Sequence, residues 1–261
     1  RKEGTIFEEQ LDDAGSAIER YRSIVEEDDG DLEALEALHR LYEQGEQYEE
    51  LHDVLLRELQ IASLGEGGDP VALKMAIGQI DLVQLGRVGE AVDQFRDILE
   101  ADPEHEGARV ALEALLDDPD HRASAAVILE PIYQANRDWE ALARGLEIRL
   151  EETAEVERRV ELLERIGNLH VERTADIARA FDAFARMLRE TPDSRIALQR
   201  LTELADAGDG WAGLSLLLEE VVPDVTDEAL AQSLLGRLAE IYEVRLADVE
   251  QAIDAHRRGL D

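Results

Sequence analysis

Six histidines are the side chains best suited to ligate a metal ion or to transfer a proton. They stand at positions 39, 52, 105, 121, 170 and 256, and no two have the His-x-x-x-His spacing that places a ligand pair on one face of a helix. His170 and His256 occupy aromatic positions of the repeats described below, so we expect them to pack in the interior. The sequence predicts no metal site and no cofactor.

Carboxylates are so numerous that their proximity carries little information. The chain has 62 acidic and 27 basic residues, which give a formal net charge of −35. Close pairs of glutamates arise by chance at this density, so they do not predict acid and base catalysis. The acidic runs at 26–29 and 151–152 lack the glycine-centred spacing of a calcium loop.

Residues for phosphate binding or nucleophilic catalysis are absent or misplaced. The segment Gly65-Glu66-Gly67-Gly68 has no Lys-Ser or Lys-Thr after it, and its glutamate repels a phosphate. No serine lies in a Gly-x-Ser-x-Gly motif, and the chain has no cysteine. We therefore expect no enzyme activity and no catalytic residue.

The negative charge also restricts the partners. Nucleic acids and anionic membranes are bound chiefly through Lys and Arg, so we exclude both. The longest stretch without a charged residue, 210–218, has nine residues, whereas a membrane-spanning helix needs about 20. A protein or peptide partner remains. The sequence leaves the oligomeric state and the compartment open, with the cytoplasm favoured.

The composition favours an all-α fold. Apolar residues make up 44% of the chain, which suffices for a core. Two Trp, five Tyr, four Phe, 18 Gly and six Pro are few for a β-sandwich or a barrel of this length.

A five-residue pattern recurs four times with spacings of 3, 10, 4 and 3. Its copies are Gly4, Phe7, Ala17, Tyr21, Ile24; Gly78, Asp81, Ala91, Phe95, Ile98; Gly167, His170, Ala180, Phe184, Met187; and Ala239, Tyr242, Ala252, His256, Gly259. A more degenerate set lies between these copies, and we expect its aromatic residues Tyr48, Trp139 and Trp211 to start second helices. Its members are Tyr42, Tyr48, Leu51, Leu55; Tyr133, Trp139, Leu142, Leu146; and Ala205, Trp211, Leu214, Leu218. Because one helical pair cannot bury such a stripe alone, the pattern predicts stacked helical hairpins. The three aromatic residues either cover the hairpin turns or anchor a partner.

The pattern resembles the tetratricopeptide repeat, a pair of helices of 34 residues. The best match is Ile166-Gly167, His170, Ala180, Phe184, Met187 and Pro192, with histidine in place of tyrosine and one residue inserted between the helices. The resemblance covers nearly the whole chain. It implies a right-handed α-solenoid of about fifteen helices in stacked antiparallel hairpins.

One step between repeats is irregular. The residues that open successive second helices, at positions 17, 51, 91, 142, 180, 214 and 252, are 34 to 40 residues apart, except that the step between positions 91 and 142 is 51 residues. The excess predicts an extra unpaired helix at 104–118, between hairpins at 1–103 and at 119–261. We also expect a loop at 63–69, and we expect the chain to be a segment of a longer protein.

In tetratricopeptide superhelices the first helices line a concave groove that takes a segment of a partner. The resemblance places twelve residues there: Glu36, Arg40, Glu43, Gln79, Leu82, Gln134, Glu164, Asn168, Val171, Glu203, Glu240 and Glu243. They are mostly acidic or amide side chains. Some members of the family clamp a terminal carboxylate with Lys or Arg beside Asn, but Asn168 has Glu164 one turn away.

The sequence therefore predicts a non-catalytic interaction scaffold that binds a basic and apolar partner segment. Two alternatives stay open. The solenoid is a regulatory or sensor arm of a larger enzyme or transcription regulator, or it is a passive structural element whose acidic residues provide solubility.

Overall fold

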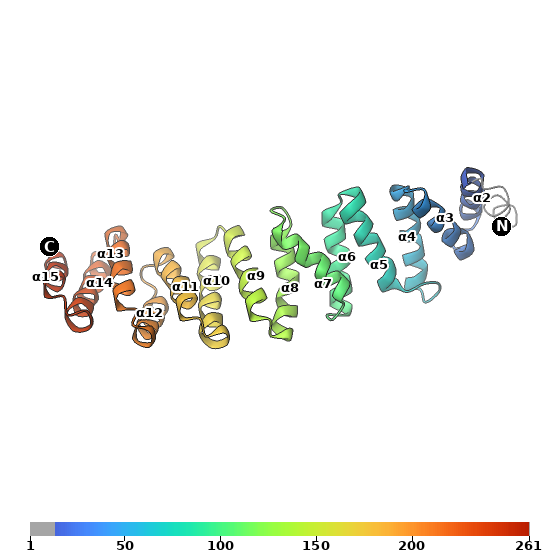
Figure 1. The fold of residues 1–261 in the computed structure, drawn as a ribbon. Coiled ribbons are helices and arrows are strands. Elements are labelled where there is room, and N and C mark those ends of the chain that lie inside the picture. Colours follow the sequence, from blue (N-terminus) through green and yellow to red (C-terminus); the bar gives the residue numbers. More distant parts are fainter. Residues whose placement is uncertain (1–13, 261) are drawn as a thin grey trace. The chain divides into compact units, whose positions relative to one another are not determined.

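The computed structural model describes residues 14–260, and this part of the chain is all-α (Figure 1). It contains fourteen α-helices and no strand, as the sequence predicts. The helix expected before residue 14, with the Gly4 and Phe7 positions, lies outside the described residues. The chain forms two compact units, unit 1 at 1–132 and unit 2 at 133–261.

The helices follow one another with short connections. In unit 1 they are α2 (Ala14–Glu27), α3 (Leu32–Gln44), α4 (Tyr48–Ser63), α5 (Pro70–Ile80), α6 (Val88–Ala101) and α7 (Glu106–Ala114). Helix α8 (Arg122–Asn136) contains the boundary. Unit 2 continues with α9 (Trp139–Glu152), α10 (Val156–Leu169), α11 (Ile177–Glu190), α12 (Arg195–Gly208), α13 (Trp211–Val221), α14 (Glu228–Glu240) and α15 (Val249–Arg258).

Within each unit, consecutive helices pack as stacked hairpins. Helix α3 contacts α4, α5 contacts α6, and α4 contacts α5 between hairpins. In unit 2, α10 with α11, α12 with α13, and α14 with α15 repeat the arrangement. Helix α7 and the 3-10 turn η2 (Leu115–Asp117) lie within 104–118. The unpaired state of that helix and the division at residues 103 and 118 stay predictions, as does the hand of the superhelix.

A missing side chain lets the two helices of a hairpin approach each other. A Cβ atom built on Gly78 would lie 2.7 Å from the ring of Phe95, and one built on Gly167 would lie 2.6 Å from the ring of Phe184. Both rings are fully buried. Each ring therefore fills the space that a glycine leaves on the facing helix.

The fourth copy departs from this packing. Ala239 stands at the glycine position and is fully buried, and its methyl group takes up space that Gly167 leaves to Phe184. His256, at the Phe position, is exposed, so the prediction that it packs inside is wrong. His170 is buried as predicted, with Nδ1 2.9 Å from Thr174 Oγ1, and burial lowers its pKa.

Three first helices end in a π-helical turn that the sequence does not predict. These turns are η1 (Asp81–Leu85), η3 (His170–Thr174) and η5 (Ile241–Arg245). In each turn a carbonyl oxygen, that of Asp81, His170 or Tyr242, accepts a hydrogen bond from the N–H six residues later. The residue before that donor has a left-handed φ of 66°, 53° or 54°. A π-helical turn contains about one residue more than an α-helical turn. The side chains of the turn therefore point in directions that the α-helical period does not predict.

Many carboxylates and arginines hold the fold together locally. Six aspartates cap helix N-termini, at positions 31, 69, 138, 176, 227 and 248. The N–H of Arg179 donates to Asp176 and lowers the pKa of that carboxyl group. Second helices of successive hairpins are also paired, because Arg186 of α11 makes a bidentate ion pair with Glu147 of α9 at 2.9 and 3.0 Å.

The two tryptophans lie beside π turns. This position agrees with the first of the two interpretations, in which they cover turns. The guanidinium of Arg245 lies 4.4 Å from the ring centre of Trp211, and that of Arg173 lies 5.2 Å from the ring centre of Trp139. Both arginines belong to π turns, η5 and η3. Trp211 is buried and Trp139 is half-buried. Among the described helices, none is long and apolar enough to span a membrane.

The glycine contacts predict opposite effects for two Gly-to-Ala changes in unit 2. Gly167→Ala should destabilise the protein by about 1–3 kcal/mol, because the buried Phe184 ring has to move. Gly236→Ala on α14 meets no atom within 4 Å and should stabilise it by about 0.5–1 kcal/mol through helix propensity. Denaturant unfolding measures both, and equal shifts would contradict the packing described here.

Candidate partner-binding groove

The structure places all twelve predicted groove residues on first helices or their π turns, and none is buried. Those in unit 1 lie on α3 (Glu36, Arg40 and Glu43), on α5 (Gln79) and on η1 (Leu82). Those in unit 2 lie on α8 (Gln134), α10 (Glu164 and Asn168), η3 (Val171), α12 (Glu203), α14 (Glu240) and η5 (Glu243). Their role in binding stays a prediction.

In unit 1 the structure brings the predicted residues together around two hollows. The first has a volume of about 600 Å³, and Glu36, Arg40 and Glu43 of α3 line it. The second has a volume of about 870 Å³, and Glu43, Gln79 and Leu82 line it. His39 and Glu43 border both hollows, and the two hollows are lined by residues of α3, α4, α5, η1 and α7.

The floor of the second hollow is apolar. Val83 of η1 is 69% exposed and Val110 of α7 is 50% exposed, although both are large aliphatic residues. Met75 and Leu82 lie beside them and are half-buried, and Ala111 and Ala114 complete the lining from α7. We call the residues lining the two hollows the unit 1 groove, and these apolar side chains its floor.

The sequence analysis missed most of this floor. Val83 follows the start of η1, where the π turn shifts the helical phase, so projection with an ordinary period misplaces it. Val110 belongs to α7, which the sequence analysis assigned to no hairpin and hence to no face. The signal that could have found Val110 is its apolar character between charged or small residues on a short helix.

The rim of the unit 1 groove is acidic. Five glutamates line it, together with one arginine and one histidine: Glu33, Glu36, Glu43, Glu58, Glu106, Arg40 and His39. The Nδ1 atom of His39 lies 3.0 Å from Oε2 of the buried Glu58. This hydrogen bond raises the pKa of His39, burial acts in the opposite direction, and the charges of Glu43 and Glu36 add to the rise.

The predicted residues of unit 2 have different surroundings. Glu203 accepts hydrogen bonds from Gln199 at 2.8 Å and from Arg200 at 3.1 Å, and the bond from Gln199 contributes most to lowering its pKa. The Oδ1 atom of Asn168 is buried and has no hydrogen-bond partner. A hollow of about 260 Å³ in unit 2 is lined by other residues, among them His170 and Arg179.

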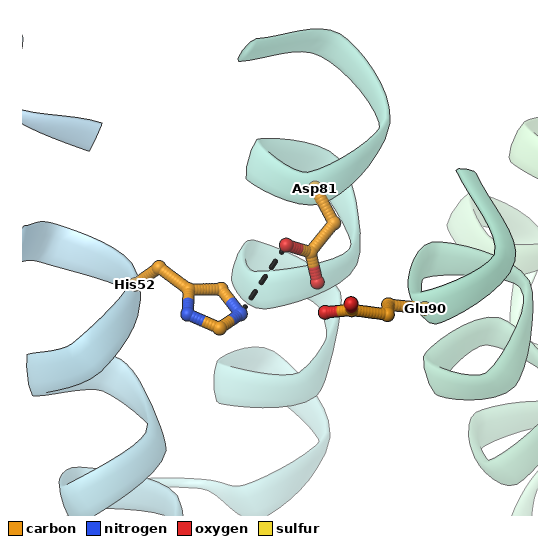
Figure 2. Close-up of side chains that lie close together, drawn as sticks. All are labelled: His52, Asp81 and Glu90. Carbon is orange, nitrogen blue, oxygen red and sulfur yellow. Dashed lines mark ion pairs between the residues drawn. The ribbon is translucent and has the colours of Figure 1, made fainter. Parts of the chain in front are cut away.

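Three possible metal ligands meet in unit 1 although they are far apart in the sequence. His52, Asp81 and Glu90 come from α4, η1 and α6, and ligand atoms of all three lie within 4.8 Å of one another (Figure 2). No two histidines are spaced as a ligand pair on one helix, and the sequence therefore predicts no metal site. Glu36 and Glu49 each stand three residues before a histidine, a spacing that points to His39 and His52.

The raised pKa of His39 predicts a pH-dependent contribution to stability. Its ordinary value is 6.5, so the contribution is fully present below that pH and is lost as the pH rises through the raised pKa. His39→Gln should cost on the order of 1 kcal/mol of unfolding free energy at low pH and less at high pH. Urea unfolding of both proteins at about pH 5.5 and 8.5 tests this, and an equal loss at both would contradict the assignment.

Comparison with known proteins gives no family model and no curated protein that matches the chain. Solved structures do align with it. The TPR2AB domain of yeast Sti1 in its pHSP90 complex is 14% identical, with 100% of this chain and 96% of that chain covered and a TM-score of 0.33. A tetratricopeptide repeat protein from Parabacteroides merdae is 13% identical, with 99% and 90% covered and a TM-score of 0.30. BtubC from P. vanneervenii is 16% identical, with 97% and 89% covered and a TM-score of 0.25.

The chain's own hairpins show its architecture. The Gly–Phe contact, the buried alanine beside it and the constant spacing recur from α5–α6 to α10–α11. The chain is an all-α protein of tetratricopeptide-like helical hairpins.

Proposed function

We propose that the protein is a non-catalytic interaction scaffold, and that its unit 1 groove binds a partner segment with apolar side chains flanked by Lys or Arg. The observation that carries this proposal is the pairing of a solvent-exposed apolar floor with an acidic rim. The acidic rim lies on α3, α4 and α7, and the apolar floor lies on α5, η1 and α7.

The floor supplies the favourable free energy. Val83 and Val110 expose 69% and 50% of their surface, so a partner side chain that covers them removes apolar area from water. Each covered valine contributes about 1 kcal/mol at the usual value of apolar burial. The volumes of about 870 and 600 Å³ can hold several side chains of an extended or helical segment.

The rim selects the charge of the partner. Five glutamates face one arginine and one histidine, so the groove attracts cations and repels a terminal carboxylate. Glu36 and Glu43 lie on the exposed face of α3, away from its buried side. On this face they can pair with a basic side chain of the partner. Recognition of a carboxylate tail, for which the family uses basic residues, does not fit this rim.

The groove lacks an arrangement for catalysis. Its one histidine has Nδ1 engaged with Glu58, and its acidic side chains are not paired with a nucleophile. We therefore assign binding to this surface. A regulatory arm of a larger protein uses the same binding step, whereas a passive element makes no use of the groove.

The proposal predicts the composition of peptides that the full chain selects. Screening a display library of random 16-residue peptides on the immobilised protein should enrich sequences with Lys or Arg beside Leu, Ile, Val or Met. The selected peptide should bind about tenfold more weakly to Val83→Ser/Val110→Ser, because two apolar contacts are lost. Glu36→Gln/Glu43→Gln and a rise in salt should each weaken binding as well.

Matched variants outside the groove serve as controls. Val244→Ser/Val249→Ser removes two valines of unit 2 that are 66% and 63% exposed, and it should leave the affinity unchanged. Selection of peptides without basic residues, or affinity that neither groove variant changes, would favour the passive structural alternative.

The acidic residues predicted in unit 2 are tested with the same peptide. If Glu164, Glu240 and Glu243 also contact the partner, their combined change to Lys should weaken binding without lowering the melting temperature. An unchanged affinity would restrict the binding surface to the unit 1 groove.

A further inference from the structure

A histidine and two carboxylates from three different elements point toward one another in unit 1 (Figure 2). The Nε2 atom of His52 lies 3.2 Å from Oδ1 of Asp81, and a carboxylate oxygen of Glu90 completes the group within 4.8 Å. His52 is 6% exposed and Asp81 only 1% exposed, whereas Glu90 is exposed. The group is thus closed on the side of α4 and η1 and open to solvent at α6.

The buried polar atoms of Asp81 and His52 have few hydrogen-bond partners. Both carboxylate oxygens of Asp81 are buried without a hydrogen-bond partner in the structure, apart from the 3.2 Å approach to His52. A buried carboxylate is unfavourable unless it is paired or coordinates a metal ion. The free Asp81 oxygen faces the Glu90 carboxylate in Figure 2, so the two acidic groups repel each other when both are ionised.

Burial raises the pKa of Asp81, and the neighbouring Glu90 raises it further, while His52 and Arg87 act in the opposite direction. The Arg87 side chain is engaged with Glu49. A cation between His52, Asp81 and Glu90 would separate the two carboxylates, whose oxygens lie within 4.8 Å of each other.

The fold itself does not require these three residues. The equivalent positions in the repeat of α9, η3 and α11 are Ala143, His170 and Arg179, and those in the repeat of α13, η5 and α15 are Ser215, Tyr242 and Gln251. All three repeats form the same π turn with the same carbonyl hydrogen bond. Packing therefore accepts non-ligating residues at these positions, and only the repeat in unit 1 carries three ligands there.

The separation of the ligand atoms suits a small divalent ion. Tetrahedral Zn²⁺ with bonds of about 2.0 Å has ligand atoms about 3.3 Å apart, close to the 3.2 Å between His52 and Asp81. An imidazole nitrogen with two carboxylates favours Zn²⁺ or a related transition metal over Mg²⁺ or Ca²⁺, which prefer oxygen ligands alone. The exposed Glu90 leaves an entry path and a position for water.

We propose that His52, Asp81 and Glu90 bind one divalent transition-metal ion of the Zn²⁺ class. The ion joins α4 to the end of α5 and to α6, and so ties two successive hairpins together. None of the three residues lines the unit 1 groove, although Leu82 and Val83 of its floor follow Asp81 in η1.

Titration of the full chain with Zn²⁺, after chelator treatment and in excess Ca²⁺, tests the site. The protein should bind one ion tightly by calorimetry, and its melting temperature should rise with Zn²⁺. Glu90→Gln should weaken that binding by on the order of 100-fold or more, because even changes beside a metal ligand cost about 10- to 100-fold. Substitution with Co²⁺ should give the strong visible absorption of a four-coordinate site.

Two variants separate metal binding from folding. Glu100→Gln removes the same charge from an exposed position of the same helix, α6, and should leave the affinity unchanged. His52→Ala introduces the residue that the repeat already has at position 143, so it should fold and lose the Zn²⁺-dependent rise in melting temperature. Several weakly bound ions, or affinity equal in the protein and in Glu90→Gln and His52→Ala, would overturn the proposal and leave a His52–Asp81 ion pair.

Discussion

The entry of one aromatic ring into the space above a glycine sets the geometry of each well-formed hairpin. Phe95 lies against Gly78 and Phe184 against Gly167, and any side chain at the glycine would collide with a ring that is fully buried. The approach fixes how close the second helix lies to the first. The first helix of each of these hairpins ends in a π turn, and a third π turn, η5, forms where Ala239 stands at the glycine position. The position of the π turn in unit 1 decides which side chains, such as Val83, enter the groove.

The negative charge serves several physical purposes at once. Aspartates cap helices, and glutamates such as Glu147 pair with arginines of the next hairpin's second helix. Glu147 and Arg186 are both half-buried, so solvent still screens their charges and the pair contributes modestly to stability. The glutamates in these pairs neutralise arginines of second helices. The unit 1 groove, in contrast, has five glutamates and only one arginine. The sequence alone assigns the acidic residues either to solubility or to partner recognition. The structure adds a third role, because some of them cap helices and pair with arginines.

The repeat spacing predicts much of the fold and little of the sites. Tyr48, Trp139 and Trp211, expected to open second helices, are the first residues of α4, α9 and α13. The starts of the second helices can be predicted because the packing residues around them recur with a constant spacing. The floor of the groove does not, because the π turn changes the period. His52 and Asp81 come together only through the stacking of two hairpins, which no local pattern encodes.

The central claim is that a partner segment lies along the first helices of unit 1. Hydrogen exchange of the full chain, with and without a saturating selected peptide, measures this directly because bound helices open less often. The account predicts slower exchange at 32–44, 70–85 and 106–114, with little change in the second helix α6, which lines neither hollow. Slower exchange confined to α4 and α6, or to unit 2, would contradict it.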